Sequence, residues 1–374
     1  MRFAVVFEGL RSPETAWSGI PWGMAEGLRE CGQEVSMVRA AAPVSAERLH
    51  RAARARAPIA TWLDPEIARL RSWTTARRLR AAGEFDAILQ LATGFRLPAH
   101  PRLATYEDMT VAQAFRADQA YAKLARRARD SWIERQRQCY AAAAVCFTLS
   151  SWAASSIVED YGVPADRVAA VGAGRNIDPH PVERPWAPPH FLFAGLDWER
   201  KNGDGVLRAF RALRAEGSGA LLTVVGDHPA IDEPGVRALG RLSIREADQR
   251  RRFTQLFEEA TCFVMPSFAE PYGIVYREAA AAGIPSIGTT KGGSSDAVGD
   301  CGVCVDPEDD AMLLAEMRRL ADPESVREIG ARGAAGREET TWGAVARLIC
   351  EHLDASAGHS DELRSDRSLL PRDQ

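Results

Sequence analysis

The stretch that decides the fold is Met265–Gly293, MPSFAEPYGIVYREAAAAGIPSIGTTKGG. An apolar run ends at Met265 and a loop follows. A helix is predicted to begin near Tyr272 or Gly273 and to include the small residues Ala279–Ala282, which let a helix pack closely on a sheet. Strand, loop and helix in this order form the repeating unit of a parallel sheet covered by helices.

Two glutamates stand in this stretch with seven residues between them. Glu270 lies in the loop, and Glu278 lies about 7.5 Å beyond Gly273 along the helix axis. Carboxylates spaced in this way can hold the two ends of an elongated ligand. The free N–H groups of Tyr272, Gly273 and Ile274 are available to a phosphate or a sugar hydroxyl. The alternative is an ordinary surface helix with an acid in its first turn, which the helix dipole favours.

Apolar runs of strand length recur along the chain, and helical patterns follow them. Such alternation predicts an α/β protein with parallel sheets. The main strand candidates are Phe3–Phe7, Phe85–Leu91, Val145–Leu149, Phe191–Ala194, Leu221–Val225 and Thr261–Met265.

The chain has 374 residues, which suits two domains of about 150–200 residues each. Residues 178–190, DPHPVERPWAPPH, hold five prolines, so neither helix nor central strand is expected there. We predict an N-terminal domain at 1–177, a linker at 178–190 and a C-terminal domain at 191–340. A helix at 341–354 can cross back to the first domain, and the polar segment 355–374 is predicted to be disordered.

Composition excludes several classes of protein. The net charge of -4 and the 26% of charged residues argue against a disordered chain and against a nucleic-acid partner. No apolar run approaches the roughly 20 residues that span a bilayer, and the first residues have no signal-peptide pattern, so we expect a cytoplasmic protein. Seven scattered cysteines fit reduced thiols. Cys301 and Cys304 have the spacing of a redox pair, but a turn before a short strand explains them better.

A second segment, Phe191–Phe210, also shows a strand, a turn and a helix: FLFAGLDWERKNGDGVLRAF. Arg200 and Lys201 fall in the turn, and Lys201 is one of only three lysines in the chain. Two cations beside helix N–H groups would neutralise a diphosphate. The alternative is a solvated basic turn.

These two segments resemble the donor-binding signature of retaining GT-B glycosyltransferases of family four. Glu270 and Glu278 match the two glutamates that are the hallmark of that family. The resemblance implies an α/β fold of two Rossmann-like domains whose parallel sheets face a central cleft. It also implies a nucleotide-diphosphate sugar donor, with UDP or GDP expected first, and neither a metal nor another cofactor.

The resemblance also implies roles for single residues. Glu278 would bind the ribose hydroxyls, and Glu270 would contact the transferred sugar. Lys201 matches a phosphate-binding lysine, and Arg200 would stand in for an arginine that many members carry where this chain has Leu196. The backbone contacts to the donor would come from Tyr272, Gly273, Ile274 and Val275.

Further matches are looser. Gly19 resembles the glycine of an N-terminal loop that faces the donor phosphate, and Gly226 and Asp227 resemble a loop near the nucleobase. Many members carry a histidine after a strand of the first domain. The corresponding stretch here, LATYEDMT at residues 103–110, has none.

Glu107 or Asp108 could occupy the position of that histidine. Of the two we take Asp108 as the candidate catalytic residue.

The sequence therefore predicts a retaining glycosyltransferase that moves a hexose or amino-sugar to a hydroxyl acceptor, either a bacterial glycan or a secondary metabolite. Alternatives are a retaining phosphorylase or sugar-phosphate synthase on the same scaffold, and a non-catalytic nucleotide-sugar-binding protein. No Gly-x-Gly-x-x-Gly pattern follows a strand, which disfavours a nicotinamide dehydrogenase. The base, the sugar, the acceptor and the oligomeric state stay open.

One basic stretch points to a different partner. Between Arg48 and Arg80 there are nine arginines and two acids, with Trp62 and Trp73 among them. Such a segment can meet an anionic membrane surface or a phosphorylated acceptor, and would then make the protein membrane-associated. The favoured alternative is two solvated helices whose long side chains cover apolar surface.

Overall fold

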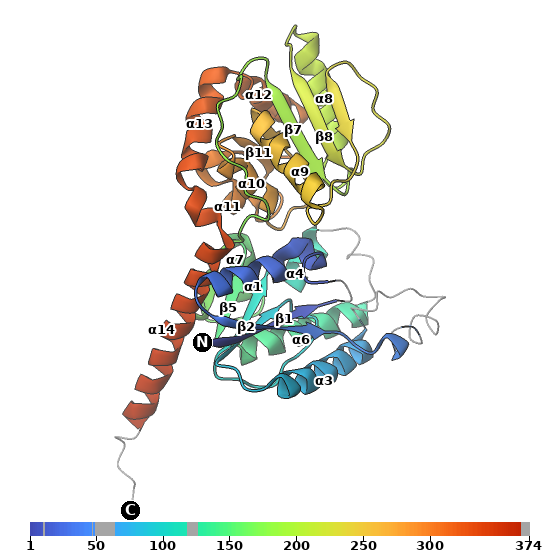
Figure 1. Cartoon of the computed structure of the whole chain (residues 1–374). Coiled ribbons are helices and arrows are strands. Elements are labelled where there is room, and N and C mark those ends of the chain that lie inside the picture. The colour runs from blue at the N-terminus through green and yellow to red at the C-terminus, as the bar shows by residue number, and fades with distance from the viewer. Residues whose placement is uncertain (10–11, 47, 49–63, 118–125, 368–374) are drawn as a thin grey trace, which may run out of the picture. The chain divides into compact units, whose positions relative to one another are not determined.

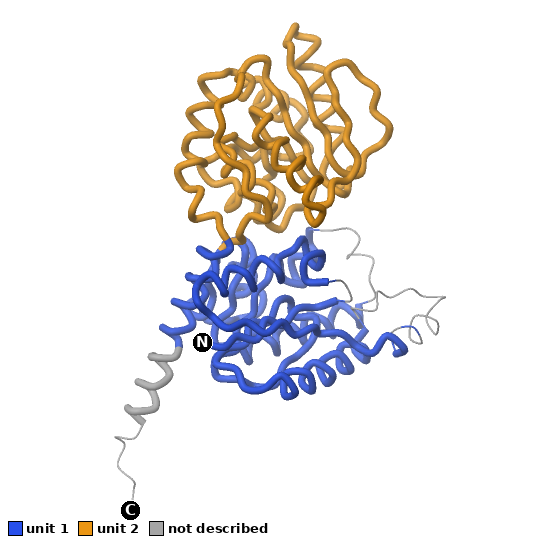
Figure 2. The backbone as a smooth tube through the Cα atoms, viewed as in Figure 1, with its two compact units in different colours: residues 1–171, 342–374 blue, residues 172–341 orange. Residues whose placement is uncertain are grey.

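The protein forms two compact units, Met1–Val171 with Trp342–Gln374, and Gly172–Thr341 (Figure 2). The computed structural model describes residues 1–9, 12–46, 48, 64–117 and 126–367, and the side chains of these residues up to 356. Each unit contains a six-stranded parallel sheet covered by helices (Figure 1). The predicted α/β fold with two Rossmann-like domains is thus confirmed.

The sheet of unit 1 has the strand order β2-β1-β3-β4-β5-β6. Its strands are rich in buried aliphatic and aromatic residues because both faces of the sheet are covered. The order reverses between β1 and β3, so the loops after these two strands diverge to opposite sides. The strands are β1 (Arg2–Glu8), β2 (Glu34–Ala40), β3 (Ala87–Leu91), β4 (Leu103–Glu107), β5 (Val145–Thr148) and β6 (Val168–Ala170).

The helices of unit 1 cover this sheet, and α1 packs on α14 while α3 contacts α6. Part of the core is an apolar cluster of Ala4, Val6, Val38, Ala40, Leu79, Ile88, Phe95 and Leu103. The described α-helices are α1 (Ile20–Glu30), α3 (Pro65–Ala82), α4 (Val111–Ala117), α6 (Arg126–Ala142), α7 (Ser151–Glu159) and α14 (Trp342–Arg367).

The sheet of unit 2 has the order β12-β11-β10-β7-β8-β9. Counted from β7, this is the 3-2-1-4-5-6 order of dinucleotide-binding folds, and it reverses between β7 and β10. Ligands of such sheets bind outside the carboxyl ends of the strands at the reversal. The strands are β7 (His190–Gly195), β8 (Leu221–Gly226), β9 (Val236–Leu239), β10 (Cys262–Val264), β11 (Ser286–Thr289) and β12 (Gly302–Val305).

The helices of unit 2 are α8 (Gly203–Ala215), α9 (Ala247–Glu259), α10 (Ile274–Ala281), α11 (Ser294–Val298), α12 (Asp310–Arg319) and α13 (Pro323–Ala335). Of these, α8, α9, α10 and α11 each connect two strands in the manner of βαβ units, whereas α12 and α13 follow the last strand.

The boundary between the units differs from the one expected at 178–190. The chain passes from unit 1 to unit 2 after residue 171 and returns after residue 341. The proline-rich segment belongs to unit 2, where the buried guanidinium of Arg184 donates hydrogen bonds of 2.6–3.1 Å to three backbone carbonyls. These contacts fix the segment against the unit, so it is not a free linker.

The C-terminal segment also differs from expectation. Helix α14 continues to Arg367, so residues 355–367 are helical where disorder was predicted. The segment contains no proline and extends a helix that has already formed, which removes the cost of nucleation. Residues 368–374 lie outside the described part of the chain.

Two glycines allow α14 to approach α1. A Cβ atom on Gly27 would lie 2.2 Å from the carbonyl oxygen of Trp342, and one on Gly23 would lie 2.2 Å from the indole nitrogen of the same residue. The backbone of α14 thus contacts α1 directly, and Trp342 fills the space above both glycines. This contact joins the two separate chain segments of unit 1.

We predict that Gly27→Ala destabilises the protein although alanine favours a helix. The new methyl group meets backbone atoms, so α14 has to move, at a cost of about 1–3 kcal/mol. Thermal unfolding measures the effect. Gly336→Ala is the control, since its Cβ would have no neighbour closer than 3.9 Å. An equal or smaller loss in Gly27→Ala than in this control would contradict the proposed packing.

Candidate functional site

The loops after β7 and β10 bring Lys201 and Glu270 together. The Lys201 Nζ atom donates to a Glu270 carboxylate oxygen, across 69 residues of sequence. The two side chains are only 12% and 8% exposed. Because β7 and β10 flank the reversal of strand order, this ion pair lies where a doubly wound sheet binds its ligand.

The backbone of Glu270 is fixed by the loop after β11. Its N–H donates to the carbonyl of Lys291 at 3.0 Å, and its carbonyl accepts from the N–H of Gly293 at 3.0 Å. Gly292 between them has φ 123°, and a Cβ there would lie 2.1 Å from the Glu270 carbonyl oxygen. Only glycine fits this close approach. The loop at Gly292 and Gly293 therefore positions Glu270.

Arg200 and Lys201 have different surroundings. Arg200 donates through Nη1 to the carbonyl of Ala269 at 2.7 Å and through Nε to Asp197 at 3.2 Å. Its side chain is therefore held against the loop that carries Glu270. Lys201 points inward, and burial lowers the pKa of its ammonium group, although the Glu270 carboxylate opposes this shift.

Helix α10 begins beside this pair. Its N-cap is Gly273, with φ 85°, and a Cβ there would lie 2.4 Å from the ring of Tyr276. Glycine has no side chain to cap the helix, so the N–H groups of Ile274 and Val275 point out of the first turn. Tyr272 is buried, and its hydroxyl accepts from Arg277 Nε at 2.9 Å.

Glu278 lies one turn further along α10 and is 3% exposed. Its Oε1 accepts from the backbone N–H of Asn176 at 3.1 Å, and a second hydrogen bond comes from the backbone of Ile177. Burial raises the pKa of this carboxyl to about 7, and these hydrogen bonds oppose the rise. No sequence pattern predicted the contact with residues 176 and 177, because Asn176 lies 102 residues away from Glu278 in the chain.

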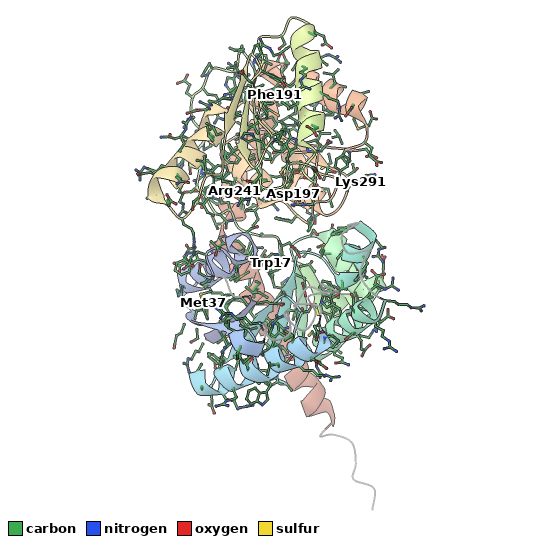
Figure 3. The ribbon with its side chains drawn as sticks, turned by 90° about the vertical axis from the view of Figure 1, so that its right-hand side faces the viewer. Trp17, Met37, Phe191, Asp197, Arg241 and Lys291 are labelled. Carbon is green, nitrogen blue, oxygen red and sulfur yellow. The ribbon has the colours of Figure 1, made fainter. Side chains whose placement is uncertain are left out.

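The predicted nucleobase loop starts at the end of β8. Gly226 has φ 116°, and a Cβ there would lie 1.8 Å from the Gly195 carbonyl oxygen, so the ends of β7 and β8 are close. Asp227 forms an exposed, bidentate ion pair with Arg241. The hydrogen bonds from Arg241 lower the pKa of the Asp227 carboxylate. Figure 3 shows Asp197, Arg241 and Lys291 along one edge of unit 2.

The candidate residues of unit 1 are linked through Trp17. Gly19 is the N-cap of α1 with φ 83°, and Trp17 and Ser18 before it also have positive φ, at 45° and 55°. Each of these two non-glycine residues costs on the order of 1–3 kcal/mol. The Trp17 indole N–H donates to Asp108 at 2.9 Å (Trp17 is labelled in Figure 3). No feature of the sequence pointed to Trp17.

Glu107 and Asp108 are neighbours with different environments. Asp108 follows β4 and contacts Trp17, whereas the Glu107 side chain is buried. Burial raises the pKa of Glu107 to about 8, against hydrogen bonds from Thr93 and Gln136. The structure thus separates the two candidates that the sequence left open.

The described residues contain neither a candidate metal site nor a candidate membrane-spanning helix. No three or more histidine, cysteine or acidic side chains come together there as a group able to hold a metal ion. None of the described helices combines the length and apolar character needed to cross a bilayer. All seven cysteines are unpaired, and burial raises the pKa of both Cys301 and Cys304.

Residues 188–322 match a family model described as glycosyl transferases group 1. The chain is 26% identical over 219 residues to an O-antigen chain mannosyltransferase B of Escherichia coli, covering 54% of this chain and 58% of that protein. It is 31% identical over 231 residues to a D-inositol 3-phosphate glycosyltransferase of Streptomyces scabiei, covering 54% and 52%. The matched region thus spans just over half the length of these relatives.

Solved structures show the same fold over nearly the whole chain. A sucrose-phosphate synthase from Thermosynechococcus elongatus matches with a TM-score of 0.67 at 16% identity, covering 93% of this chain and 97% of that one. WaaG, a glycosyltransferase involved in lipopolysaccharide biosynthesis, matches with a TM-score of 0.63 at 14% identity, covering 94% and 99%. These likenesses confirm a GT-B fold.

We predict that Glu278 makes the stability of the protein fall between about pH 4.5 and pH 7. Its pKa is higher in the folded state, so the folded protein binds the proton more tightly than the unfolded chain. The resulting stabilisation is complete below the ordinary value of 4.5 and is lost as the pH rises through 7. Relative to Glu278→Gln, the wild type should lose about 3 kcal/mol over this range.

Urea unfolding across this pH range gives the free energy of unfolding of the wild type and of Glu278→Gln. The contributions of other titrating groups are the same in both proteins, so they cancel in the difference. Glu233→Gln is the control, because hydrogen bonds from Arg211 lower the pKa of this exposed carboxylate and its effect has the opposite sign. A difference between wild type and Glu278→Gln that stays constant with pH would contradict the prediction.

Proposed function

We propose that this chain is a retaining glycosyltransferase, because its residues 188–322 match the family model of the glycosyl transferases group 1 and its fold is GT-B. It moves a hexose or amino-sugar from a nucleotide-diphosphate sugar to a hydroxyl acceptor and needs no metal. Unit 2 binds the donor, with UDP or GDP as its nucleotide, and unit 1 binds the acceptor. The observation that carries the proposal is the Lys201–Glu270 ion pair at the β7/β10 reversal.

Charge supports a diphosphate at this place. Lys201 and Arg200 supply two cations, and the first turn of α10 supplies N–H groups that favour an anion. Lys201 is paired with Glu270 in this structure, which offsets the cost of burying both charges. A donor phosphate would share Lys201 and leave the second Glu270 oxygen for a sugar hydroxyl.

Glu278 and the loop after β8 would hold the nucleoside. One Glu278 oxygen is fixed by the segment at residues 176–177, so the carboxyl is already oriented when a ribose hydroxyl arrives. Gly226 lets the backbone of the base loop come close to β7, and Asp227 follows it. Preorganisation of this kind reduces the entropy lost on binding.

The chemistry we propose needs few protein groups. The bond between the sugar and the diphosphate breaks, and the acceptor hydroxyl attacks from the face that the diphosphate leaves. The acceptor proton passes to the departing phosphate oxygen. Arg200 and Lys201 stabilise the negative charge that develops there, while Glu270 orients the sugar and forms no covalent bond.

Unit 1 contributes the remaining proposed residues. Gly19 opens α1, whose free N–H groups suit a phosphate, and Asp108 is the proposed catalytic carboxylate of this unit. The hydrogen bond from Trp17 orients the Asp108 carboxylate and supports this role.

We predict that Lys201→Ala and Glu270→Ala each lower sugar transfer by about 10²–10³-fold without loss of the fold. The assay is product formation, read by mass spectrometry, with a panel of UDP-, GDP-, dTDP- and ADP-sugars and hydroxyl acceptors. Arg208→Ala, which removes an exposed ion pair with Asp310, is the matched control and should keep full activity.

Each other outcome of this assay has a definite meaning. Sugar release that requires inorganic phosphate would indicate a phosphorylase. Tight binding of a nucleotide-sugar in a thermal-shift panel, without turnover for any acceptor, would indicate a binding protein. Near-normal transfer by either variant would remove Lys201 or Glu270 from the mechanism.

A membrane contact through Arg48–Arg80 is a separate proposal, and residues 49–63 lie outside the described part of the chain. Within α3, Trp73 is 54% exposed and the Arg77 guanidinium lies 5.3 Å from its ring centre. Such a pair suits an anionic surface. We predict salt-sensitive pelleting with anionic liposomes that weakens in Trp73→Ala. Equal recovery with neutral liposomes would show that these arginines are only solvated.

A further inference from the structure

Four buried oxygen atoms in unit 1 stand out. By strict hydrogen-bond geometry, Gln90 Oε1, Thr105 Oγ1, Glu107 Oε1 and Tyr140 Oη lack a partner among the described residues, although Thr105 lies near enough to Cys146 to lower the pKa of its thiol. Each belongs to a side chain that is at most 4% exposed. Buried polar atoms are satisfied in nearly all native proteins, so a group of four calls for a partner beyond the described side chains.

Three of these side chains lie on one face of the sheet. Gln90 of β3 and Thr105 of β4 are register partners, and Glu107 lies two residues beyond Thr105 on the same strand. Side chains alternate along a strand, so positions 105 and 107 share a face, and paired positions on neighbouring strands share it too.

Tyr140 reaches this face from α6, which contacts β4. The carbonyl of Phe95 joins the two sides, since it accepts from Gln90 Nε2 at 2.8 Å and from Cys139 Sγ, one residue before Tyr140, at 3.2 Å. The Glu107 carboxylate also contributes to the raised pKa of Tyr140. The four oxygens therefore line one layer between the sheet and α6.

We propose that β3, β4 and α6 enclose an internal hydration site, in which bound water hydrogen-bonds to Gln90 Oε1, Thr105 Oγ1, Glu107 Oε1 and Tyr140 Oη. A buried water makes about three hydrogen bonds, so roughly one or two molecules satisfy all four atoms. The Gln90 oxygen only accepts, whereas the two hydroxyls both donate and accept. Water is the small ligand that supplies donors and acceptors together.

The protonation of Glu107 favours water over a cation. Burial raises its pKa to about 8, and the charges of Asp108 and Glu8 raise it further. At neutral pH the carboxyl is therefore uncharged. The cysteine and tyrosine side chains that face it are also neutral, because burial raises their pKa values: Cys139 and Tyr140 on α6, Cys146 on β5, and Tyr161. An uncharged carboxyl beside uncharged thiols and phenols offers a metal ion no anionic ligand.

The first experiment depends on the sign of a stability change. Tyr140→Phe and Thr105→Val each remove one polar atom and keep the shape of the side chain. If water binds these atoms, each variant lowers the unfolding midpoint by about 2–4 °C. If the atoms are dry and unpaired, each variant leaves the midpoint unchanged or raises it, and the proposal is overturned.

Tyr161→Phe is the matched control. The Tyr161 hydroxyl accepts from the N–H of Ala112 at 3.2 Å, so its loss shows the effect of removing a known hydrogen bond. If Tyr140→Phe shifts the unfolding midpoint in the same direction and by a similar amount as Tyr161→Phe, then the Tyr140 hydroxyl also makes a hydrogen bond in the wild type.

The second experiment identifies the ligand. A high-resolution crystal structure should show density about 2.7–3.2 Å from Tyr140 Oη and Glu107 Oε1. Replacing sodium by potassium or choline in the buffer should leave the unfolding midpoint unchanged. A cation dependence of the midpoint, or a layer closed by direct protein contacts without density, would overturn the proposal.

Discussion

The candidate site depends on one buried ion pair, between Lys201 and Glu270. Each charge alone would be costly at this depth, so each makes the burial of the other tolerable. The pair also ties the turn after β7 to the loop after β10, two strands that are neighbours in the sheet but distant in the sequence. The pairing of β7 with β10 in the sheet thus brings the two charged side chains together.

Much of this site could be predicted because its geometry is local. The spacing between Glu270 and Glu278 places one acid before α10 and the other on it, and Lys201 lies just before the N-cap of α8. Such relations follow from helix rise and strand direction. They hold wherever the strands finally pair, which is why the positions of these side chains relative to their helices could be predicted from the sequence.

The features that escaped prediction depend on distant contacts. Arg184 fixes the proline-rich segment to unit 2 through carbonyls that lie 73–98 residues away, so proline content alone suggested a linker. The contrast between Glu107 and Asp108 depends on which face of β4 each side chain takes and on what covers that face. The hydrogen bond from Trp17 to Asp108 requires an unusual backbone that no sequence pattern announced.

The return of α14 to unit 1 affects how the protein is made. A ribosome synthesises the N-terminal segment of unit 1 first. Trp342, which packs on Gly23 and Gly27, follows only after the 170 residues of unit 2. At about 5–20 residues per second, these two glycines therefore stay without their partner for roughly 10–30 s during synthesis. Throughout that interval the face of α1 that carries Gly23 and Gly27 lacks its partner helix, so unit 1 completes its packing only after unit 2 has been synthesised.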